Sequence, residues 1–292
     1  MVILDINQGQ YKTYILTDAI AQTRLEVVPE RGGIITRWQV QGKDLLYLDG
    51  DRFTDPSLSV RGGIPILFPI CGNLPNNTYS HQGKTYTLKQ HGFARDLPWT
   101  VSDRPPQDGI TLVLQSNDQT RIIYPFDFEL TFTYRLQGNA LIIQQRYVNR
   151  SPEPMPFSTG LHPYFAVSDF AVSDAASEKN QLQFDIPATQ LTNQIDQTQH
   201  SFSGQFDFEQ TEIDVAFRQV AQHEASVTHS GHRLTLSYDA IYATLVFWTI
   251  KGKDYYCLEP WSAPRNAMCT GEDLTLLQPG ATVETWVKLA ID

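Results

Sequence analysis

Four short segments of the chain each place one or two polar side chains among glycine, proline and aromatic residues. They are residues 61–72, 91–99, 160–165 and 256–261. Rigid walls with a few well-placed polar groups are what a concave small-molecule site requires. Two of the segments carry His162 and Glu259, and a histidine with a glutamate in one pocket forms an acid and base pair suited to neutral pH.

The residues beside this histidine and glutamate restrict the local backbone. Pro163 follows His162 and biases it towards an extended conformation. Glu259 follows an apolar run and precedes Pro260, so the sequence places it at the end of a strand. Burial of a carboxylate at such a position raises its pKa towards the range in which it works as a base.

The other polar candidates have competing structural explanations. His91 precedes Gly92, where the backbone can approach a ligand closely, but a lone histidine more often has a structural role. Arg61 and Arg95 can equally pair with surface carboxylates. The remaining histidines lie among polar residues, which favours solvated roles: His81, His200, His223, His229 and His232. The last two lack further ligands at metal-binding spacing.

The elements that must position these residues are β-strands, because apolar residues recur mainly with period two between Gly, Pro, Asn and Asp. Residues 128–136 and 140–148 flank a Gly-bearing turn, as do residues 243–250 and 255–259, and both pairs predict hairpins. Few windows show the spacing of a helix. The most polar stretch, about residues 189–231, predicts long loops over one face.

The composition excludes several classes of protein. Of the 292 residues, 41% are hydrophobic and 18% are charged, which rules out a disordered tail or a coiled coil. The net charge of −10 argues against non-specific nucleic-acid binding and against an anionic membrane surface. Because no linker or charge block divides the chain, we expect a single domain over residues 1–292.

The cysteines and the apolar segments predict a location. Three cysteines, an odd number in no metal-binding spacing, favour a reduced, cytoplasmic compartment. The first residues lack the pattern of a signal peptide, and no run approaches the ~18 apolar residues of a membrane span. The chain also has no GxGxxG after a strand, no P-loop and no GxSxG, so nucleotide binding and the common serine hydrolases lose support.

Taken together and in this order, the segments resemble the aldose 1-epimerase (galactose mutarotase-like) superfamily, which includes a hexose-6-phosphate mutarotase branch. The similarity covers nearly the whole chain. Its motifs are residues 27–36, Arg61-Gly-Gly-Ile-Pro, His91-Gly-Phe-Ala-Arg, His162-Pro-Tyr-Phe and Leu258-Glu-Pro. The resemblance implies an all-β fold, a large single-domain antiparallel β-sandwich of the supersandwich type, with the sugar site in an open cleft on one sheet.

The resemblance also implies a role for each matched residue. His162 is the expected general acid and Glu259 the expected general base. His91 and Arg61 are expected to bind the sugar. Asp214, in a looser motif, is expected to be a further ligand of a sugar hydroxyl group.

The implied activity is that of an aldose 1-epimerase, which interconverts the α and β anomers of a hexose by ring opening and reclosure. Glu259 must start as a carboxylate and His162 as an imidazolium, which a position across the sugar from each other would favour. No step requires a metal or an organic cofactor, and we expect activity to survive a chelator. Four aromatic side chains are candidates to stack on the sugar: Tyr164, Phe93, Trp261 and Trp99.

Two alternatives stay open. Arg61 and Arg95 are suited to bind the phosphate of a hexose 6-phosphate, although we place a free aldose first. A non-catalytic carbohydrate-binding or sensing protein would keep the fold, but the presence of both His162 and Glu259 favours an enzyme. The expected partner is a small sugar or sugar phosphate, with no nucleic acid and no membrane, and the sequence predicts no oligomeric state.

Overall fold

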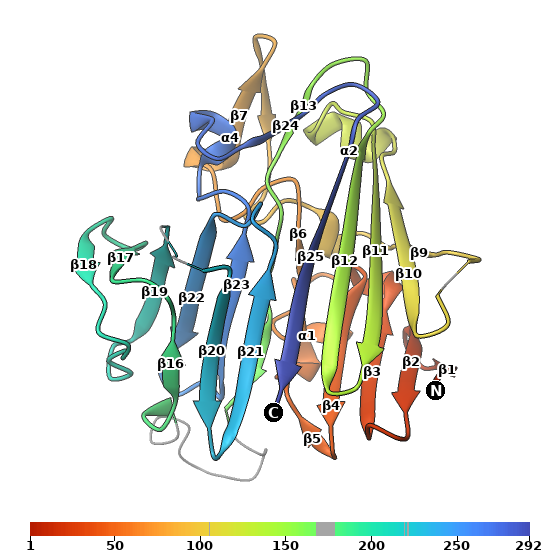
Figure 1. Ribbon diagram of the computed structural model, residues 1–292. Coiled ribbons are helices and arrows are strands. Elements are labelled where there is room, and N and C mark those ends of the chain that lie inside the picture. The colour runs from red at the N-terminus through yellow and green to blue at the C-terminus, as the bar shows by residue number, and fades with distance from the viewer. Residues whose placement is uncertain (105, 168–178, 219, 221) are drawn as a thin grey trace.

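The computed structural model describes residues 1–104, 106–167, 179–218, 220 and 222–292, and its strands form two layers (Figure 1). The layer at the front of Figure 1 is one antiparallel sheet. In spatial order it contains β16 (Gln183–Asp185), β20 (Glu224–His229), β21 (His232–Tyr238), β25 (Thr282–Ile291), β12 (Ala140–Asn149), β11 (Phe128–Gln137), β10 (Gly109–Gln115) and β9 (Thr100–Val101).

The rear layer combines two further sheets. One contains β18 (Gln199–Ser201), β17 (Gln190–Asn193), β19 (Glu212–Phe217), β22 (Thr244–Ile250), β23 (Tyr255–Trp261), β14 (Gly160–Leu161) and β6 (Ile66–Leu67), and β15 (Tyr164–Ala166) also pairs with β23. The other contains β1 (Val2–Gln8), β2 (Lys12–Asp18), β3 (Thr23–Val28), β4 (Ile34–Val40) and β5 (Lys43–Asp44). Isolated bridges, including Ile35 to Ile64 and Leu48 to Gly62, connect the two.

The hydrophobic core lies between the layers, and period-two alternation creates it. Along β11, alternate side chains are buried, namely Phe128, Leu130, Phe132, Tyr134 and Leu136, while most residues between them are half-buried. Phe132 packs edge-on against Trp99 and Tyr147. Each buried side chain of this size contributes about 1.5–3 kcal/mol relative to exposure.

Arg31 lies between β3 and β4 and holds the segment of residues 52–58 against the N-terminal sheet. Its buried guanidinium donates hydrogen bonds of 2.8–3.1 Å to four backbone carbonyl groups, those of Arg52, Phe53, Asp55 and Leu58. These carbonyls belong to α1 (Gly50–Thr54) and the turn after it. We call this arrangement the Arg31 anchor, and it fixes the loop that carries Arg52.

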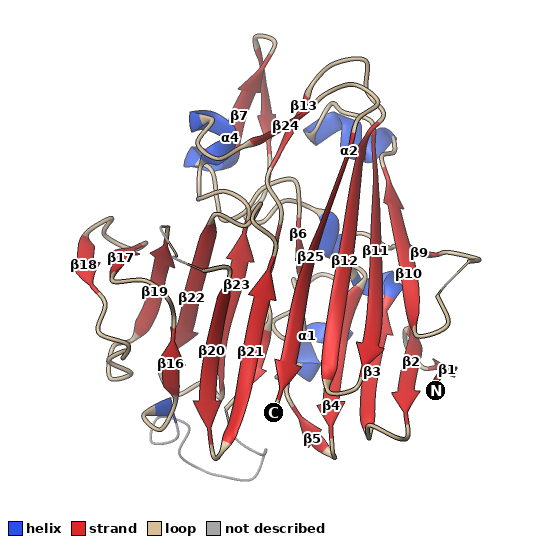
Figure 2. Ribbon diagram, in the orientation of Figure 1, coloured by secondary structure: helices blue, strands red, loops and turns tan. Residues whose placement is uncertain are grey.

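Short elements outside these sheets include the hairpin of β7 (Thr78–His81) and β8 (Lys84–Thr87), the pair of β13 (Met155–Phe157) and β24 (Thr275–Leu277), and the helices α2 (Asp118–Ile123) and α4 (Ala267–Thr270). Figure 2 shows how strongly strands predominate over these short helices. In the described residues no helix is long and apolar enough to cross a membrane.

The sequence-based expectations for the two hairpins and the antiparallel sandwich are confirmed. The first hairpin pairs β11 with β12, and the second pairs β22 with β23. The expectation of long loops over residues 189–231 is wrong for much of that stretch, because β17 to β20 lie within it. These strands are short, so their alternation extends over too few residues to stand out from a polar background. The single-domain organisation stays a prediction.

Candidate active site

A cavity of about 430 Å³ lies on the face of the rear layer that points away from the core. Three neighbouring strands supply alternate residues to it: Glu212 and Asp214 from β19, Val246 and Trp248 from β22, and Glu259 and Trp261 from β23. Loops, short strands and short helices around them supply the other lining residues, which are Arg52, Ser59, Val60, Arg61, Gln90, His91, Arg95, His162, Tyr164 and Arg265. The cavity is therefore lined by all six polar residues that the sequence proposed for the site: Arg61, His91, Arg95, His162, Asp214 and Glu259.

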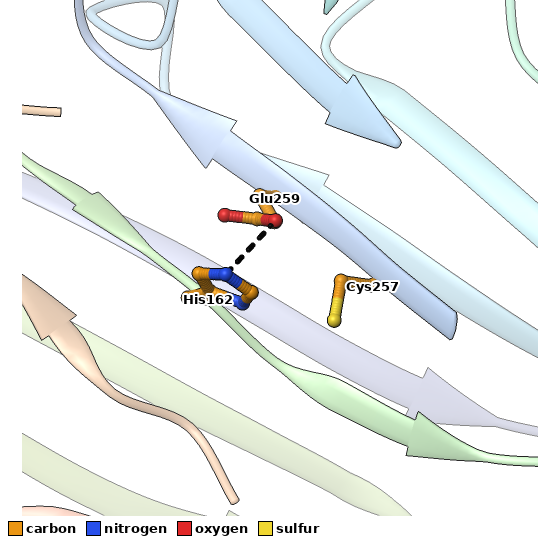
Figure 3. A group of neighbouring side chains, drawn as sticks. All are labelled: His162, Cys257 and Glu259. Atoms are coloured by element: carbon orange, nitrogen blue, oxygen red, sulfur yellow. Dashed lines mark ion pairs between the residues drawn. The ribbon is translucent and has the colours of Figure 1, made fainter. Parts of the chain in front are cut away.

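His162 and Glu259 are in direct contact at the floor of this cavity. His162 Nε2 lies 3.3 Å from Glu259 Oε1, as the dashed line in Figure 3 marks. Glu259 projects from β23, and His162 lies between β14 and β15, which both pair with β23. Both side chains are buried. The two groups therefore touch each other in the structure, and their position relative to a bound sugar stays a prediction.

Burial sets the protonation of the pair. It raises the pKa of Glu259 well above that of an ordinary glutamate, and it lowers the pKa of His162 below that of an ordinary histidine. Both shifts favour a neutral pair, with one proton on the carboxyl group and none added to the imidazole. A carboxylate with an imidazolium carries the same single proton, so the two forms differ only in where that proton sits.

Two aromatic residues support the pair. Trp261 Nε1 donates a hydrogen bond of 3.0 Å to Glu259 Oε2, which fixes the carboxyl group from the side opposite His162. Tyr164 stacks on the His162 ring, with centroids 4.6 Å apart and planes 7° from parallel. Phe93 and Trp99, which the sequence suggested as further sugar platforms, instead pack in the core against Phe68 and Phe132.

The proton position on His91 follows from its backbone contacts. The Gly72 N–H donates to His91 Nδ1 at 3.1 Å, so Nδ1 is an unprotonated acceptor. Burial lowers the pKa of His91 well below its ordinary value, so the ring is neutral and its proton is on Nε2. His91 lines the cavity and thus offers an N–H donor to a ligand.

Gly92, beside this histidine, is required by close backbone packing. Its φ is +71°, and a Cβ there would overlap the carbonyl oxygen of Phe68. Gly92 therefore makes a close approach to Phe68, and an approach of its backbone to a ligand stays a prediction.

We expect Gly92→Ala to lower the free energy of unfolding by more than about 1 kcal/mol, through positive φ and overlap together. Urea denaturation measures this change. Gly83→Ala is the matched control, since Gly83 has a φ of +75° and a Cβ added there would have nothing within 4 Å. An equal loss in both variants would show that the Phe68 contact contributes nothing.

Asp214 and Arg265 form an ion pair at the edge of the cavity. Arg265 Nη2 donates to Asp214 Oδ2 at 2.6 Å, and the guanidinium lies 5.9 Å from the centroid of the Trp261 ring. Asp214 Oδ1 is buried and has no hydrogen-bond partner in the described part of the chain. Because Asp214 lines the cavity, this oxygen is an available acceptor for a ligand hydroxyl group.

Three further arginines line the cavity, and their charges are not taken up by carboxylates. Among the described residues, no ion pair involves Arg52, Arg61 or Arg95. Arg52 Nε and Arg95 Nη2 donate to backbone carbonyl groups, and Arg95 Nε is buried without a partner in the same part of the chain. The alternative that Arg61 and Arg95 pair with surface carboxylates is therefore wrong.

Sequence reasoning missed several residues of the cavity. Glu212 lies two positions before Asp214 on the same strand face, so the period of a strand could have identified it. Arg52 and Ser59 are brought to the cavity by the loop of the Arg31 anchor, which no local pattern indicates.

The floor also contains a group of potential metal ligands. One ligand atom each from His162, Cys257 and Glu259 lies within 4.8 Å of the other two. These are the residues drawn in Figure 3. A histidine nitrogen, a thiol and a carboxylate are all ligands that zinc accepts.

The fold and this site define an antiparallel β-sandwich with a paired acid and base on one sheet face. Residues 15–290 match the aldose 1-epimerase family, and the chain belongs to that family. The chain is similar to the crystal structure of the Slr1438 protein from Synechocystis sp. PCC 6803, with 45% identity, a TM-score of 0.91 and 98% of each chain covered.

More distant proteins share the fold or part of the sequence. A galactose mutarotase-like protein from Clostridium acetobutylicum shares the fold at 19% identity, with a TM-score of 0.82 over 100% of this chain and 98% of that chain. A protein of Cenchrus ciliaris, whose name proposes glucose-6-phosphate 1-epimerase activity, is 30% identical over 152 residues. That match spans 48% of this chain and only 43% of the relative. The LacX protein of Lactococcus lactis is 27% identical over 73% of this chain and 78% of its own length.

Proposed function

We propose that the protein is an aldose 1-epimerase, which interconverts the α and β anomers of a hexose. The observation that carries this proposal is the buried contact between His162 and Glu259 at the cavity floor. The two oxygens that exchange protons in the reaction, O1 and O5, are bonded to the same carbon of the sugar. An acid and a base that touch each other, 3.3 Å apart, are therefore well placed to serve both oxygens.

Ring opening breaks the bond between C1 and O5. The single proton of the pair first moves from Glu259 to His162. Glu259, now a carboxylate, accepts the proton of the C1 hydroxyl group, and His162, now an imidazolium, donates a proton to O5. The electron pair of the broken bond stays on O5 while C1 becomes an aldehyde carbon. Rotation about the C1–C2 bond presents the other face of the carbonyl, and the reverse proton transfers close the ring. The pair holds one proton throughout.

The rest of the cavity supplies binding groups of complementary kinds. His91 offers its Nε2–H as a donor, and Asp214 offers Oδ1 as an acceptor. Trp261 and Tyr164 form apolar walls beside the pair. A cavity of about 430 Å³ lies within the range of small-molecule sites.

The arginines favour a hexose 6-phosphate over a free hexose as the substrate. The sequence alone had favoured the free hexose. Arg52, Arg61 and Arg95 approach one cavity without carboxylate partners among the described residues, and guanidinium groups bind phosphate through paired, charge-assisted hydrogen bonds. The overall charge of −10 does not oppose such a local site. The name of the Cenchrus ciliaris relative agrees with this choice.

The direct test is anomer exchange measured by NMR for α-D-glucose, α-D-galactose and glucose 6-phosphate. We expect the protein to accelerate exchange, most strongly for the phosphosugar. Acceleration of the free sugars alone would reverse the substrate choice. Sugar binding without acceleration of any of the three would instead support the non-catalytic carbohydrate-binding alternative.

The single proton of the pair predicts a broad pH profile. Because the pKa of His162 is lowered, the pair gains a second proton only below the pH at which an ordinary histidine titrates. Because the pKa of Glu259 is raised, the pair loses its only proton above the pH at which an ordinary glutamate titrates. We expect kcat/KM to fall on the acid side only below the range of an ordinary histidine, and to fall on the alkaline side above the range of an ordinary glutamate. Anomer exchange rates across the pH range measure this, and a fall that follows an ordinary histidine near pH 6.5 would contradict it.

Trp261 is proposed as a positioning residue that acts through Glu259. Trp261→Phe removes the indole N–H and keeps an aromatic wall, so we expect kcat to fall about tenfold with little change in KM. Steady-state kinetics separates the two constants. Trp248→Phe is the matched control, because Trp248 Nε1 donates to Glu212 and not to the catalytic pair. A change in KM alone for Trp261→Phe would mean that the residue only binds substrate.

A further inference from the structure

A third ligand-bearing side chain lies at the cavity floor, and the proposed reaction does not use it. Cys257 lies two residues before Glu259 on β23, so both side chains project from the same face of that strand, with the His162 ring beside them (Figure 3). The three ligand atoms lie within 4.8 Å of one another. Cys257 is fully buried behind the pair and is not among the residues that line the cavity.

We propose that His162, Cys257 and Glu259 form a zinc-binding site, and that a bound zinc ion inhibits the enzyme by occupying its acid and its base. Three protein ligands leave the fourth tetrahedral position of the zinc ion open for a water molecule. Because His162 and Glu259 line the cavity, this position faces the cavity. The ligand set of nitrogen, sulfur and oxygen suits zinc and excludes magnesium and calcium, which prefer oxygen ligands.

The geometry requires only a small adjustment. Ligand atoms around a tetrahedral zinc ion are about 3.3–3.7 Å apart, given bond lengths of about 2.0–2.3 Å. The contact of 3.3 Å between His162 and Glu259 already has this length. The remaining separations, of at most 4.8 Å, close through rotation of side chains on adjacent backbone segments.

The charges also balance. Zinc binding releases the thiol proton of Cys257 and the single proton of the pair to the solvent, so that a thiolate, a carboxylate and a neutral imidazole surround the ion. Two negative ligands with Zn²⁺ make a neutral complex. A neutral complex is compatible with this buried floor and with the arginines near it, whereas an isolated cation is not.

Metal binding can be tested without reference to catalysis. We expect calorimetry with ZnCl₂ to detect this site, and CoCl₂ to produce the charge-transfer absorption of a cobalt thiolate. Cys257→Ala should abolish that absorption and weaken zinc binding at least about tenfold. Two controls should retain both signals: Cys269→Ala, which removes an exposed thiol, and His232→Ala, which removes a surface histidine. An unchanged affinity in Cys257→Ala would overturn the proposal.

Inhibition is the second measurement, and it rests on the proposed epimerase activity. Zinc should suppress anomer exchange by the unaltered protein and a chelator should restore it, while Cys257→Ala should keep the basal rate and resist zinc at least about tenfold better. If that variant does not fold, X-ray absorption at the zinc edge of the unaltered protein must show one sulfur ligand at about 2.3 Å. A shell of nitrogen and oxygen alone would refute the site, whether or not the protein is an epimerase.

Discussion

Replacing Glu259 with glutamine should lower kcat/KM for anomer exchange by about 10²–10⁴-fold, the range in which a general base contributes. Glutamine keeps the size of the side chain, and its amide oxygen can still accept the Trp261 N–H. It cannot accept the proton of the C1 hydroxyl group, however, so the loss should appear in kcat. NMR exchange rates at saturating sugar would measure it directly.

Two further variants make this result specific. His162→Ala should cause a loss of similar size, and the double variant should be little worse than either single one, because the two residues act as a unit. Glu212→Gln is the control, since Glu212 lines the same cavity but bonds to Trp248. If Glu259→Gln and Glu212→Gln reduced the rate equally, the assignment of Glu259 as the base would fail.

Removing one of the cavity arginines should separate phosphorylated from free sugars. For Arg61→Ala or Arg95→Met we expect KM for glucose 6-phosphate to rise roughly 10–150-fold, the equivalent of about 1.5–3 kcal/mol for a hydrogen bond to a charged group. KM for glucose should change little, because glucose has no phosphate group for these arginines to bind. Steady-state kinetics with both sugars is the measurement.

Arg37→Ala provides the comparison for these arginine variants. Arg37 pairs with Asp44 outside the cavity. Its replacement therefore changes the net charge by the same amount as Arg61→Ala or Arg95→Met but removes no residue of the cavity. We expect it to leave both KM values unaltered. Equal increases for both sugars in Arg61→Ala would indicate that this arginine binds the hexose ring and not a phosphate.

Much of the fold could be predicted because its central strands are long and alternate regularly. The hairpin of β11 and β12 has one apolar face and one more polar face over ten residues in each strand. β1 escaped prediction for the opposite reason, since its side chains are almost all exposed and mark no core face. The short strands β17 and β18 offer too few residues for alternation to be recognised.

The candidate site was predictable in its membership but not in its internal contacts. His162 and Glu259 stood out because each lies in a rigid, apolar segment. Their direct contact depends on the register in which β14 and β15 pair with β23, and this pairing joins residues that lie nearly a hundred positions apart in the sequence. The neutral state of the pair follows from that burial, so it too lay beyond what the residue types alone indicate.

The Arg31 anchor bears on how this cavity can change over evolution. Because one guanidinium holds four backbone carbonyl groups, the path of the loop depends on acceptors that every amino acid possesses. Substitutions at positions such as Arg52 therefore alter the chemistry at the rim without altering the course of the chain. We therefore expect substitutions of Arg52 to change ligand binding while the protein keeps its fold.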